Sequence, residues 1–227
     1  MKQTTENDFK KSINKEKNEK ILKIYKTIKP EIKKAIKGYK EAWNKSEKEI
    51  FAEIAFCILT PQSKAKNAWS AITTLVENNL LYTGNAAEIV DYLNIVRFKN
   101  NKSKYLIELR NLMTRHEKLQ PKKILSEIND TFEKRKWILK NIKGMGLKEA
   151  SHVLRNLGFG ENIAILDRHI LRNLNELNVI DSIPKTITEK KYYEIEEKMR
   201  NYSKFCKINM NELDLVLWYK EAGEVFK

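Results

Sequence analysis

Two short stretches of the chain carry residues that could act together on a sugar-phosphate backbone. Gly144 and Gly146 stand one position apart, Lys148 follows, and Asp167 comes nineteen positions after that lysine. Glycines let a turn adopt positive φ and carry no Cβ that would keep a phosphate at a distance. A deprotonated amine is a nucleophile, and a carboxylate can stabilise positive charge on a sugar or assist proton transfer. The pattern therefore predicts phosphate binding beside covalent chemistry on DNA.

The role of Lys148 can be interpreted in two ways. In a lysine-rich chain, the default is a surface lysine that contacts phosphate. The alternative is a nucleophile, because a helix N-terminus disfavours a cation and so favours the free amine. Such an amine could attack C1′ of a deoxynucleotide, expel the base and leave a Schiff base. Asp167 could assist this reaction, and it could also be the N-cap of its own helix.

The overall charge favours a polyanionic partner. The chain has 227 residues, with 44 Lys and Arg against 30 Asp and Glu, which gives a formal net charge of +14. Such an excess suits binding to nucleic acid, although a lysine-rich surface that only maintains solubility is the alternative. The length is sufficient for one domain or two small ones. The sequence contains no run of about twenty apolar residues, so we expect no membrane span.

The cysteines and histidines argue against a metal or iron–sulfur site. Cys57 and Cys206 lie far apart, and two cysteines cannot ligate a four-cysteine cluster. His152 and His169 have no metal-ligand companion at a suitable spacing, so we expect no metal and no cofactor. Cys57 lies in an apolar run, which predicts a buried free thiol. Free thiols fit a reducing cytoplasm, where binding to DNA would associate the protein with the nucleoid.

Polar–apolar periodicity predicts an all-α fold with no strand and no internal repeat. Isoleucines recur every three or four residues between Ile21 and Tyr39, and Pro30 is expected to divide this stretch into two helices. Residues 1–20 are nearly all polar and predict a flexible basic arm, which either adds phosphate contacts or is a solvated tail. Further helices are expected at residues 47–59, 64–78, 86–93, 105–115, 121–129, 132–141, 149–157, 168–177, 189–202 and 210–221.

The helices on either side of the two glycines predict a helix-hairpin-helix motif, with its hairpin at residues 142–148. Backbone N–H groups of the turn and of the next helix would point at the DNA backbone and ignore its sequence. We expect Lys143, Gly144 and Gly146 to make these contacts. His152 lies one turn beyond the lysine of the motif and could also meet a phosphate.

The residues around this motif resemble a known superfamily. Residues 141–156, together with residues 164–171, resemble the helix-hairpin-helix DNA glycosylases, with their Gly/Pro-rich loop and aspartate. Within that superfamily the chain is similar to the second, mainly archaeal family of 8-oxoguanine DNA glycosylase/AP lyases. The similarity extends through residues 212–215 and 218–219 to Lys227, and it covers roughly residues 50–227.

The resemblance implies catalytic roles at two positions. Lys148 falls where the family has its Schiff-base lysine, and Asp167 falls where the family has its catalytic aspartate. Lys143 departs from the pattern, because it replaces a proline that is common in this hairpin. That change should leave the turn intact but less rigid. The iron–sulfur cysteines of the endonuclease III branch are also missing from the sequence, which argues against that branch.

The resemblance also implies contacts with the DNA strands. The segment 59–63, between two helices, is similar to the one that reaches into the duplex, and Gln62 would help to fill the space left by the flipped base. Arg97 and Phe98, in a basic loop, are similar to the pair that probes this gap and the opposite base.

Recognition of the lesion is expected at the end of the chain. Guanine accepts a hydrogen bond at N7, whereas 8-oxoguanine donates one there, so an acceptor would favour the lesion. The resemblance places the C-terminal residue, Lys227, near the lesion, and its carboxylate is an acceptor. Trp218 and Phe226 offer faces on which the extruded base could stack, and core packing is the alternative for Trp218.

The resemblance therefore implies a bifunctional glycosylase that flips 8-oxoguanine, forms a Schiff base and cuts the strand by β-elimination. We expect a monomer that acts on double-stranded DNA containing 8-oxoguanine or abasic sites. Two helical subdomains are expected, residues 45–150 and residues 21–44 with 151–227, with the active-site cleft between them. The alternatives are a glycosylase for another lesion, such as an oxidised pyrimidine, or a noncatalytic DNA-binding module.

Overall fold

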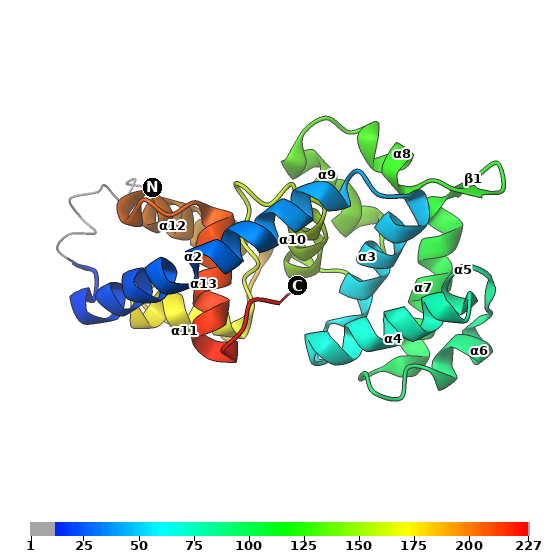
Figure 1. The fold of residues 1–227 in the computed structure, drawn as a ribbon, viewed down its shortest axis with the longest axis horizontal. Helices are drawn as coiled ribbons and strands as arrows, with labels where there is room; N and C mark the ends of the chain where they lie inside the picture. The colour runs from blue at the N-terminus through cyan, green and yellow to red at the C-terminus, as the bar shows by residue number, and fades with distance from the viewer. Residues whose placement is uncertain (1–11, 227) are drawn as a thin grey trace. The chain divides into compact units, whose positions relative to one another are not determined.

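The computed structural model describes residues 12–226, and these residues form an all-α fold, as the sequence predicts (Figure 1). The strands in this part of the chain are β1 (Thr114–Arg115) and β2 (Lys118–Leu119), which pair antiparallel. The expectation of no strand is therefore wrong at this one hairpin. Its two-residue turn, His116 and Glu117, has positive φ at both positions, as a tight hairpin turn requires. Strands of two residues are too short to give a sequence pattern.

The chain divides into two compact units. Within the described residues, the terminal unit comprises residues 12–39 and 160–226, and the central unit comprises residues 40–159. The boundary expected at residue 150 differs from the observed one, because helix α10 (Leu147–Asn156) belongs wholly to the central unit. There α10 packs against helices α3 and α9, and this packing explains why the unit extends to Phe159.

Four helices form the described part of the terminal unit. They are α2 (Lys15–Ala42, whose last residues belong to the central unit), α11 (Arg168–Glu176), α12 (Glu189–Cys206) and α13 (Met210–Ala222). The Tyr25 hydroxyl donates to Glu212 Oε2 at 2.9 Å and so joins α2 to α13. The Tyr202 hydroxyl donates to Asn18 Oδ1 at 2.8 Å and joins α12 to α2.

Helix α2 differs from the sequence-based expectation in two ways. It continues through Pro30 instead of dividing there. Pro30 is exposed, so the carbonyl that loses its N–H partner can meet water, while Ile28 and Ile32 continue the buried stripe past it. Residues 15–20 of the expected arm are helical, and residues 1–11 lie outside the described residues.

The central unit is built around α3 (Glu47–Leu59). Every residue from Ile50 to Leu59 is buried, and Ser46 and Glu49 form a capping box at the N-terminus of the helix. Helices α4, α7, α8 and α10 pack against it. The other helices of this unit are α4 (Ala65–Glu77), α5 (Leu80–Thr83), α6 (Ala86–Asp91), α7 (Lys99–Met113), α8 (Pro121–Ser126) and α9 (Thr131–Asn141).

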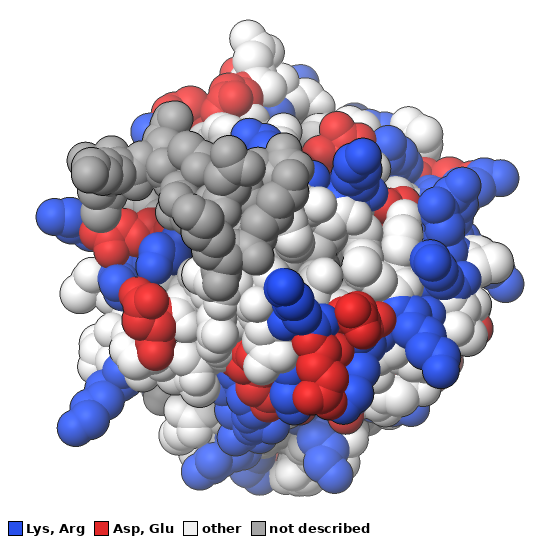
Figure 2. Space-filling view, turned by 90° about the vertical axis from the view of Figure 1, so that its left-hand side faces the viewer, with Lys and Arg blue, Asp and Glu red and all other residues white. Residues whose placement is uncertain are grey.

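The charged side chains are mixed on the face that Figure 2 shows, where basic residues alternate with acidic ones. This mixture does not mark that face as a continuous polyanion-binding surface. Within residues 12–226, no helix has both the length and the apolar character needed to cross a membrane.

Candidate active site

The predicted helix-hairpin-helix consists of α9, the turn at residues 142–146, and α10. Asp130 caps α9, since its side chain accepts hydrogen bonds from the backbone N–H groups of Phe132 and Glu133. Ile142, before the glycines, and Met145, between them, are both buried. These apolar side chains anchor the turn while its backbone stays at the surface.

The two glycines of the turn have different backbone conformations. Gly144 has φ of +84°, and a Cβ there would lie 2.4 Å from Cδ2 of Tyr105, so both conformation and space require glycine. Gly146 has an extended backbone with φ of −99°, so positive φ is used at only one of the two positions. The reason is that Gly146 is the N-cap of α10, and an N-cap takes an extended conformation. Its N–H donates to Glu149 Oε2 at 3.1 Å.

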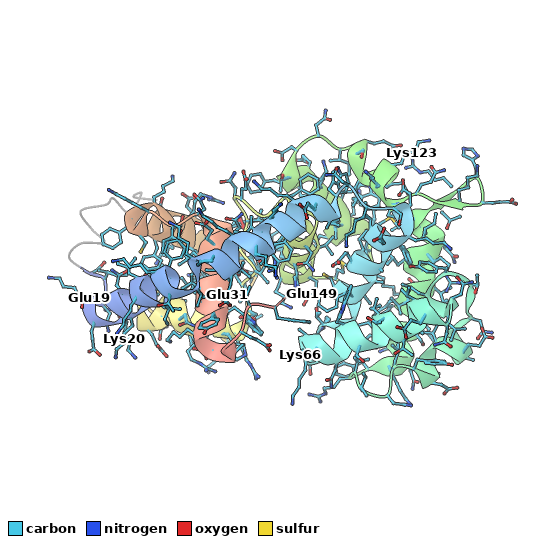
Figure 3. All side chains as sticks on the ribbon, viewed as in Figure 1. Glu19, Lys20, Glu31, Lys66, Lys123 and Glu149 are labelled. Carbon is cyan, nitrogen blue, oxygen red and sulfur yellow. The ribbon has the colours of Figure 1, made fainter. Side chains whose placement is uncertain are left out.

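Lys148 lies in the first turn of α10, and its side chain is 24% exposed. Its Nζ is 3.6 Å from Oε1 of Glu149, whose side chain is 14% exposed. Glu149, labelled in Figure 3, therefore contacts the Lys148 ammonium with one oxygen and Gly146 with the other. Glu149 is a further residue of this site, beyond those expected from the sequence. The acidic residue three positions after the helix N-cap was the available signal.

Buried side chains from α3 and α10 lie behind this turn. Cys57 is a fully buried free thiol, as expected, and burial is the main cause that raises its pKa, with Glu53 adding to the effect. His152 is only 5% exposed, and its ring packs edge-on against Phe56 at 5.5 Å. A phosphate contact needs an exposed side chain, so the structure gives His152 a packing role instead.

Lys143 and Gly144 are exposed at the surface of the turn. The Lys143 ammonium lies 3.2 Å from Glu108 Oε1 and 5.8 Å from the centre of the Tyr105 ring. Side-chain exposure is 62% for Lys143 and 47% for Glu108, so water screens this ion pair strongly. A phosphate could therefore displace Glu108 at little cost.

Asp167 is the N-cap of α11 in the terminal unit. Its Oδ1 accepts hydrogen bonds from the backbone N–H groups of His169 and Ile170, both at 2.8 Å. The expected capping role is thus present. Because both bonds end on Oδ1, the cap leaves Oδ2 available for another contact.

Trp218, on α13, lies in the same unit. Its indole packs edge-on against the His169 ring at 5.4 Å, and His169 Nδ1 lies 3.5 Å from Glu221 Oε2. The indole Nε1 is buried and makes no hydrogen bond within residues 12–226. Phe226 is partly buried, and Lys227 lies outside the described residues. The Trp218 ring thus packs against His169 within this unit, while the residue stays partly exposed.

Two loops of the central unit hold the remaining candidate residues next to each other. Gln62 is exposed in the turn after α3, and Phe98 is 53% exposed at the start of α7. The Arg97 guanidinium lies over the Phe98 ring at 5.5 Å. The backbone N–H of Arg97 donates to Ser63 Oγ at 3.0 Å, which joins the two loops directly.

Ile95 was not singled out in the sequence. It lies in the same loop as Phe98 and is 49% exposed. Exposed apolar side chains beside Phe98 could pack against unstacked bases. Among the described residues, no group of His, Cys, Asp and Glu is arranged to hold a metal ion.

Known proteins are similar to this chain over most of its length, and they share one description. A family model described as 8-oxoguanine DNA glycosylase matches residues 32–208. An 8-oxoguanine DNA glycosylase/AP lyase of Fusobacterium nucleatum subsp. nucleatum is 60% identical over 208 residues, which cover 91% of this chain and 96% of the relative. The protein of the same name from Methanocaldococcus jannaschii is 37% identical over 206 residues, which cover 88% and 93%.

Solved structures agree with this assignment. The crystal structure of the Methanocaldococcus jannaschii 8-oxoguanine DNA glycosylase matches with a TM-score of 0.82 and 36% identity, covering 92% of this chain and 95% of that one. A structure of the enzyme from that organism in complex with a 15mer DNA containing 8-oxoguanine matches with a TM-score of 0.81 and 34% identity, covering 91% and 99%. The chain therefore belongs to the 8-oxoguanine DNA glycosylase family.

Proposed function

We propose that this protein is a bifunctional DNA repair enzyme, which excises 8-oxoguanine from double-stranded DNA and then cuts the strand as an AP lyase. One observation carries the proposal beyond family membership. The Lys148 side chain is only 24% exposed and lies two residues after a turn in which Gly144 must be glycine, and Glu149 contacts both the amine and the turn. A turn that only bound phosphate would not need a partly buried amine at this place.

In this proposal Lys148 is the nucleophile. After its ammonium loses a proton, Nζ forms a bond to C1′ of the flipped nucleotide while the C1′–N9 bond breaks. The base leaves with the electron pair of that bond and gains a proton, and the sugar ring opens to give a Schiff base. Asp167 stabilises the positive charge on the sugar, with Oδ2 available because its cap uses Oδ1.

The lyase step follows from the same intermediate. The Schiff base makes the C2′ hydrogens acidic, so loss of one proton drives cleavage of the C3′–O bond, with the electron pair leaving on the phosphate. Water then hydrolyses the Schiff base and releases Lys148. The strand is cut 3′ to the lesion, and the amine is regenerated for another turnover.

DNA contacts and lesion recognition are assigned to three regions. The exposed turn at Lys143 and Gly144 binds phosphate, while Gln62 fills the gap left by the flipped base. Arg97 and Phe98 probe that gap, and the exposure of both side chains supports this role. Trp218 and Phe226 supply apolar surface on which the extruded base can stack.

The test is borohydride trapping on a duplex that contains 8-oxoguanine. The native protein should form a covalent adduct, and Lys148→Gln should form none. Lys143→Gln is the matched control, because it removes an exposed lysine of the same turn and should still trap. Adduct formation by Lys148→Gln would refute the assignment of the nucleophile. A panel of duplexes with oxidised pyrimidines, run in parallel, would identify a different lesion preference.

Asp167 can be tested separately from the helix that it caps. Asparagine is also a good N-cap, so Asp167→Asn should keep the fold and the DNA affinity while base release slows by about 100-fold or more. Single-turnover excision kinetics measure this change. Unchanged turnover would show that Asp167 only caps α11.

We further propose that the protein acts as a monomer in the cytoplasm, where binding to DNA associates it with the nucleoid. The free thiols of Cys57 and Cys206 support a reducing compartment. Light scattering of the protein with and without a lesion duplex tests the proposed stoichiometry of one protein per site. A dimer on a single lesion would contradict the monomer.

A further inference from the structure

A buried lysine outside the catalytic turn holds the loop that follows α3. Lys102 lies on α7 and is only 3% exposed. Its ammonium donates three hydrogen bonds, to Leu59 O at 2.7 Å, to Pro61 O at 2.8 Å and to Ser63 Oγ at 3.0 Å. An ammonium has three protons, so its donor capacity is fully used. All three acceptors belong to the segment that contains Gln62.

The same contacts reach the second loop. The Ser63 hydroxyl accepts from the Lys102 ammonium and also from the backbone N–H of Arg97. The backbone N–H of Lys102 donates to Phe98 O at 3.0 Å and so closes the first turn of α7. Lys102 is therefore hydrogen-bonded directly to the turn that contains Gln62. It is also linked to the loop that contains Arg97 and Phe98, through Ser63 and through its own backbone N–H.

The tips of both loops have strained backbones. Gln62 has φ of 53° and Phe98 has φ of 60°, which is the left-handed region that side-chain-bearing residues rarely adopt. Both side chains are exposed, so burial of these side chains does not offset the strain. Such conformations persist when the surrounding structure fixes them, and they gather at functional sites. At the Gln62 turn, the three hydrogen bonds from Lys102 fix the backbone in this conformation.

The burial and the hydrogen bonds of Lys102 differ from those of a lysine that only caps the C-terminus of α3. A lysine near a helix C-terminus can bond the last carbonyls while its charge stays in water. Lys102 is instead buried, and burial is the main cause that lowers its pKa to about 8, although Glu149 raises it. Two of its three bonds also go past Leu59, the last residue of α3, into the turn. Burying a charged ammonium costs free energy, but the charge also strengthens its hydrogen bonds to the turn.

We propose that Lys102 is a positioning residue, which holds the Gln62 turn and the Arg97–Phe98 loop in one fixed arrangement for entry into duplex DNA. This inference rests on the proposed function, because it assumes that these side chains contact DNA around a flipped base. Lys102 itself does not touch the reacting atoms. Its effect should therefore appear only where the duplex must be opened and the gap filled.

The experiment compares two substrates that need Lys148 equally but need the loops differently. The first is a duplex with 8-oxoguanine, on which single-turnover excision is measured. The second is a single-stranded oligonucleotide with a preformed abasic site, on which borohydride trapping is measured. The variants are Lys102→Met, which removes the ammonium, and Ser63→Ala, which removes the atom shared by the loops. Lys104→Met, at an exposed position of the same helix, is the matched control.

Lys102→Met should slow duplex excision by about 10- to 100-fold and change single-strand trapping by less than about threefold. Ser63→Ala should slow duplex excision by about three- to tenfold, and Lys104→Met should match the native protein on both substrates. Fluorescence of 2-aminopurine placed opposite the lesion should also report weaker base unstacking by Lys102→Met.

Two results would overturn the inference. One is equal loss on both substrates in Lys102→Met and in Ser63→Ala, which would mean that these contacts only maintain the fold. The other is duplex excision by both variants at the rate of Lys104→Met. If Lys102→Met does not fold, the result for Ser63→Ala decides alone. Failure of the proposed function would look different, because the native protein would then act on neither substrate.

Discussion

Two turns of the central unit, residues 142–146 and residues 60–63, use left-handed backbone for different purposes. Gly144 has φ of 84°, and the Tyr105 ring occupies the space where a side chain would be. Gln62 has φ of 53° and keeps a long, exposed side chain. We infer that glycine is used where the backbone itself must approach DNA, whereas a side chain is kept where the side chain must enter the duplex.

The difference decides which turn needs support. A left-handed conformation costs a residue with a side chain roughly 1–2 kcal/mol, while glycine adopts it readily. The hairpin therefore needs only the bond from Gly146 N–H to Glu149 and its buried apolar flanks. The Gln62 turn is held in addition by a buried ammonium with three acceptors. Rigidity at the two turns thus has different physical sources.

The largest effect should follow from giving the hairpin a side chain. In Gly144→Ala the new Cβ would meet the Tyr105 ring at 2.4 Å, and alanine would be strained at φ of +84°. We expect the free energy of unfolding to fall by about 2–4 kcal/mol, and DNA affinity to fall with it. Thermal unfolding and fluorescence anisotropy with an undamaged duplex measure the two losses.

Gly146→Ala is the matched control, since its backbone is extended and the new Cβ would lie 3.2 Å from one carboxylate oxygen of Glu149. It should cost less than about 1 kcal/mol. Adding Tyr105→Ala to Gly144→Ala removes the clash and should recover part of the stability. Equal losses at both glycines would show that the two positions do not differ as proposed.

Replacing Gln62 by glycine in the second turn should reduce excision while changing the stability of the fold little. In Gln62→Gly the left-handed strain disappears, while the added freedom of the unfolded chain costs about 0.5–1 kcal/mol, so stability should change little. Excision from the 8-oxoguanine duplex should fall about tenfold, equivalent to about 1.4 kcal/mol of transition-state stabilisation. Gln62→Asn tolerates the same backbone and should lie between the two. A large loss of stability in Gln62→Gly would contradict this account.

Local signals in the sequence explain why part of this comparison was predictable. The bounds of α3 agree with the expectation because Pro61 follows the apolar run and stops the helix. The hairpin was predictable because Gly144 and Gly146 lie between two periodic stretches. A short polar residue directly before a helix is a common N-cap, and Asp130 has this position before α9. Each of these signals is local, within a few residues of the feature that it predicts.

The features that could not be predicted depend on tertiary contacts, which the spacing of residues along the sequence does not encode. Lys102 is one of 44 basic residues, and nothing local separates a buried lysine from an exposed one. His152 follows Lys148 by one turn, yet its burial against Phe56 depends on how α10 packs on α3. Pro30 is tolerated because its side of α2 is exposed, which again depends on packing.

A smaller effect is expected at Glu149, which contacts both the hairpin and the proposed nucleophile, Lys148. Glu149→Gln keeps an oxygen that can accept from Gly146 N–H but removes the charge beside Lys148. A partly exposed ion pair contributes about 0.2–1 kcal/mol, so the free energy of unfolding should fall by no more than this amount. Trapping should slow by about two- to fivefold, because Lys148 loses a contact that positions its amine. Glu149→Ala removes both contacts and should also lower the free energy of unfolding by about 1 kcal/mol. Identical behaviour of the two variants would mean that the charge has no separate role.

The smallest expected effect, a dependence on pH, tests whether the ammonium of Lys102 holds the Gln62 turn. Its pKa in the folded protein is about 8, lowered from 10.5 mainly by burial, with Glu149 raising it and Lys148 lowering it further. Between these values the unfolded chain binds more protons at this residue, so this residue makes the free energy of unfolding rise as pH rises from about 8 to 10.5.

Excision that depends on the two loops should weaken as pH rises, whereas the free energy of unfolding should increase. A neutral amine has two N–H donors for three acceptors, so one bond of Lys102 to Leu59, Pro61 or Ser63 is lost above about pH 8. The ratio of duplex excision to single-strand trapping should therefore fall two- to threefold, roughly, between pH 7 and 9.5, because taking the ratio cancels pH effects that are common to both reactions. Lys102→Met should show a constant ratio. A native ratio that stays constant while stability rises would mean that the neutral amine holds the Gln62 turn as well as the ammonium does.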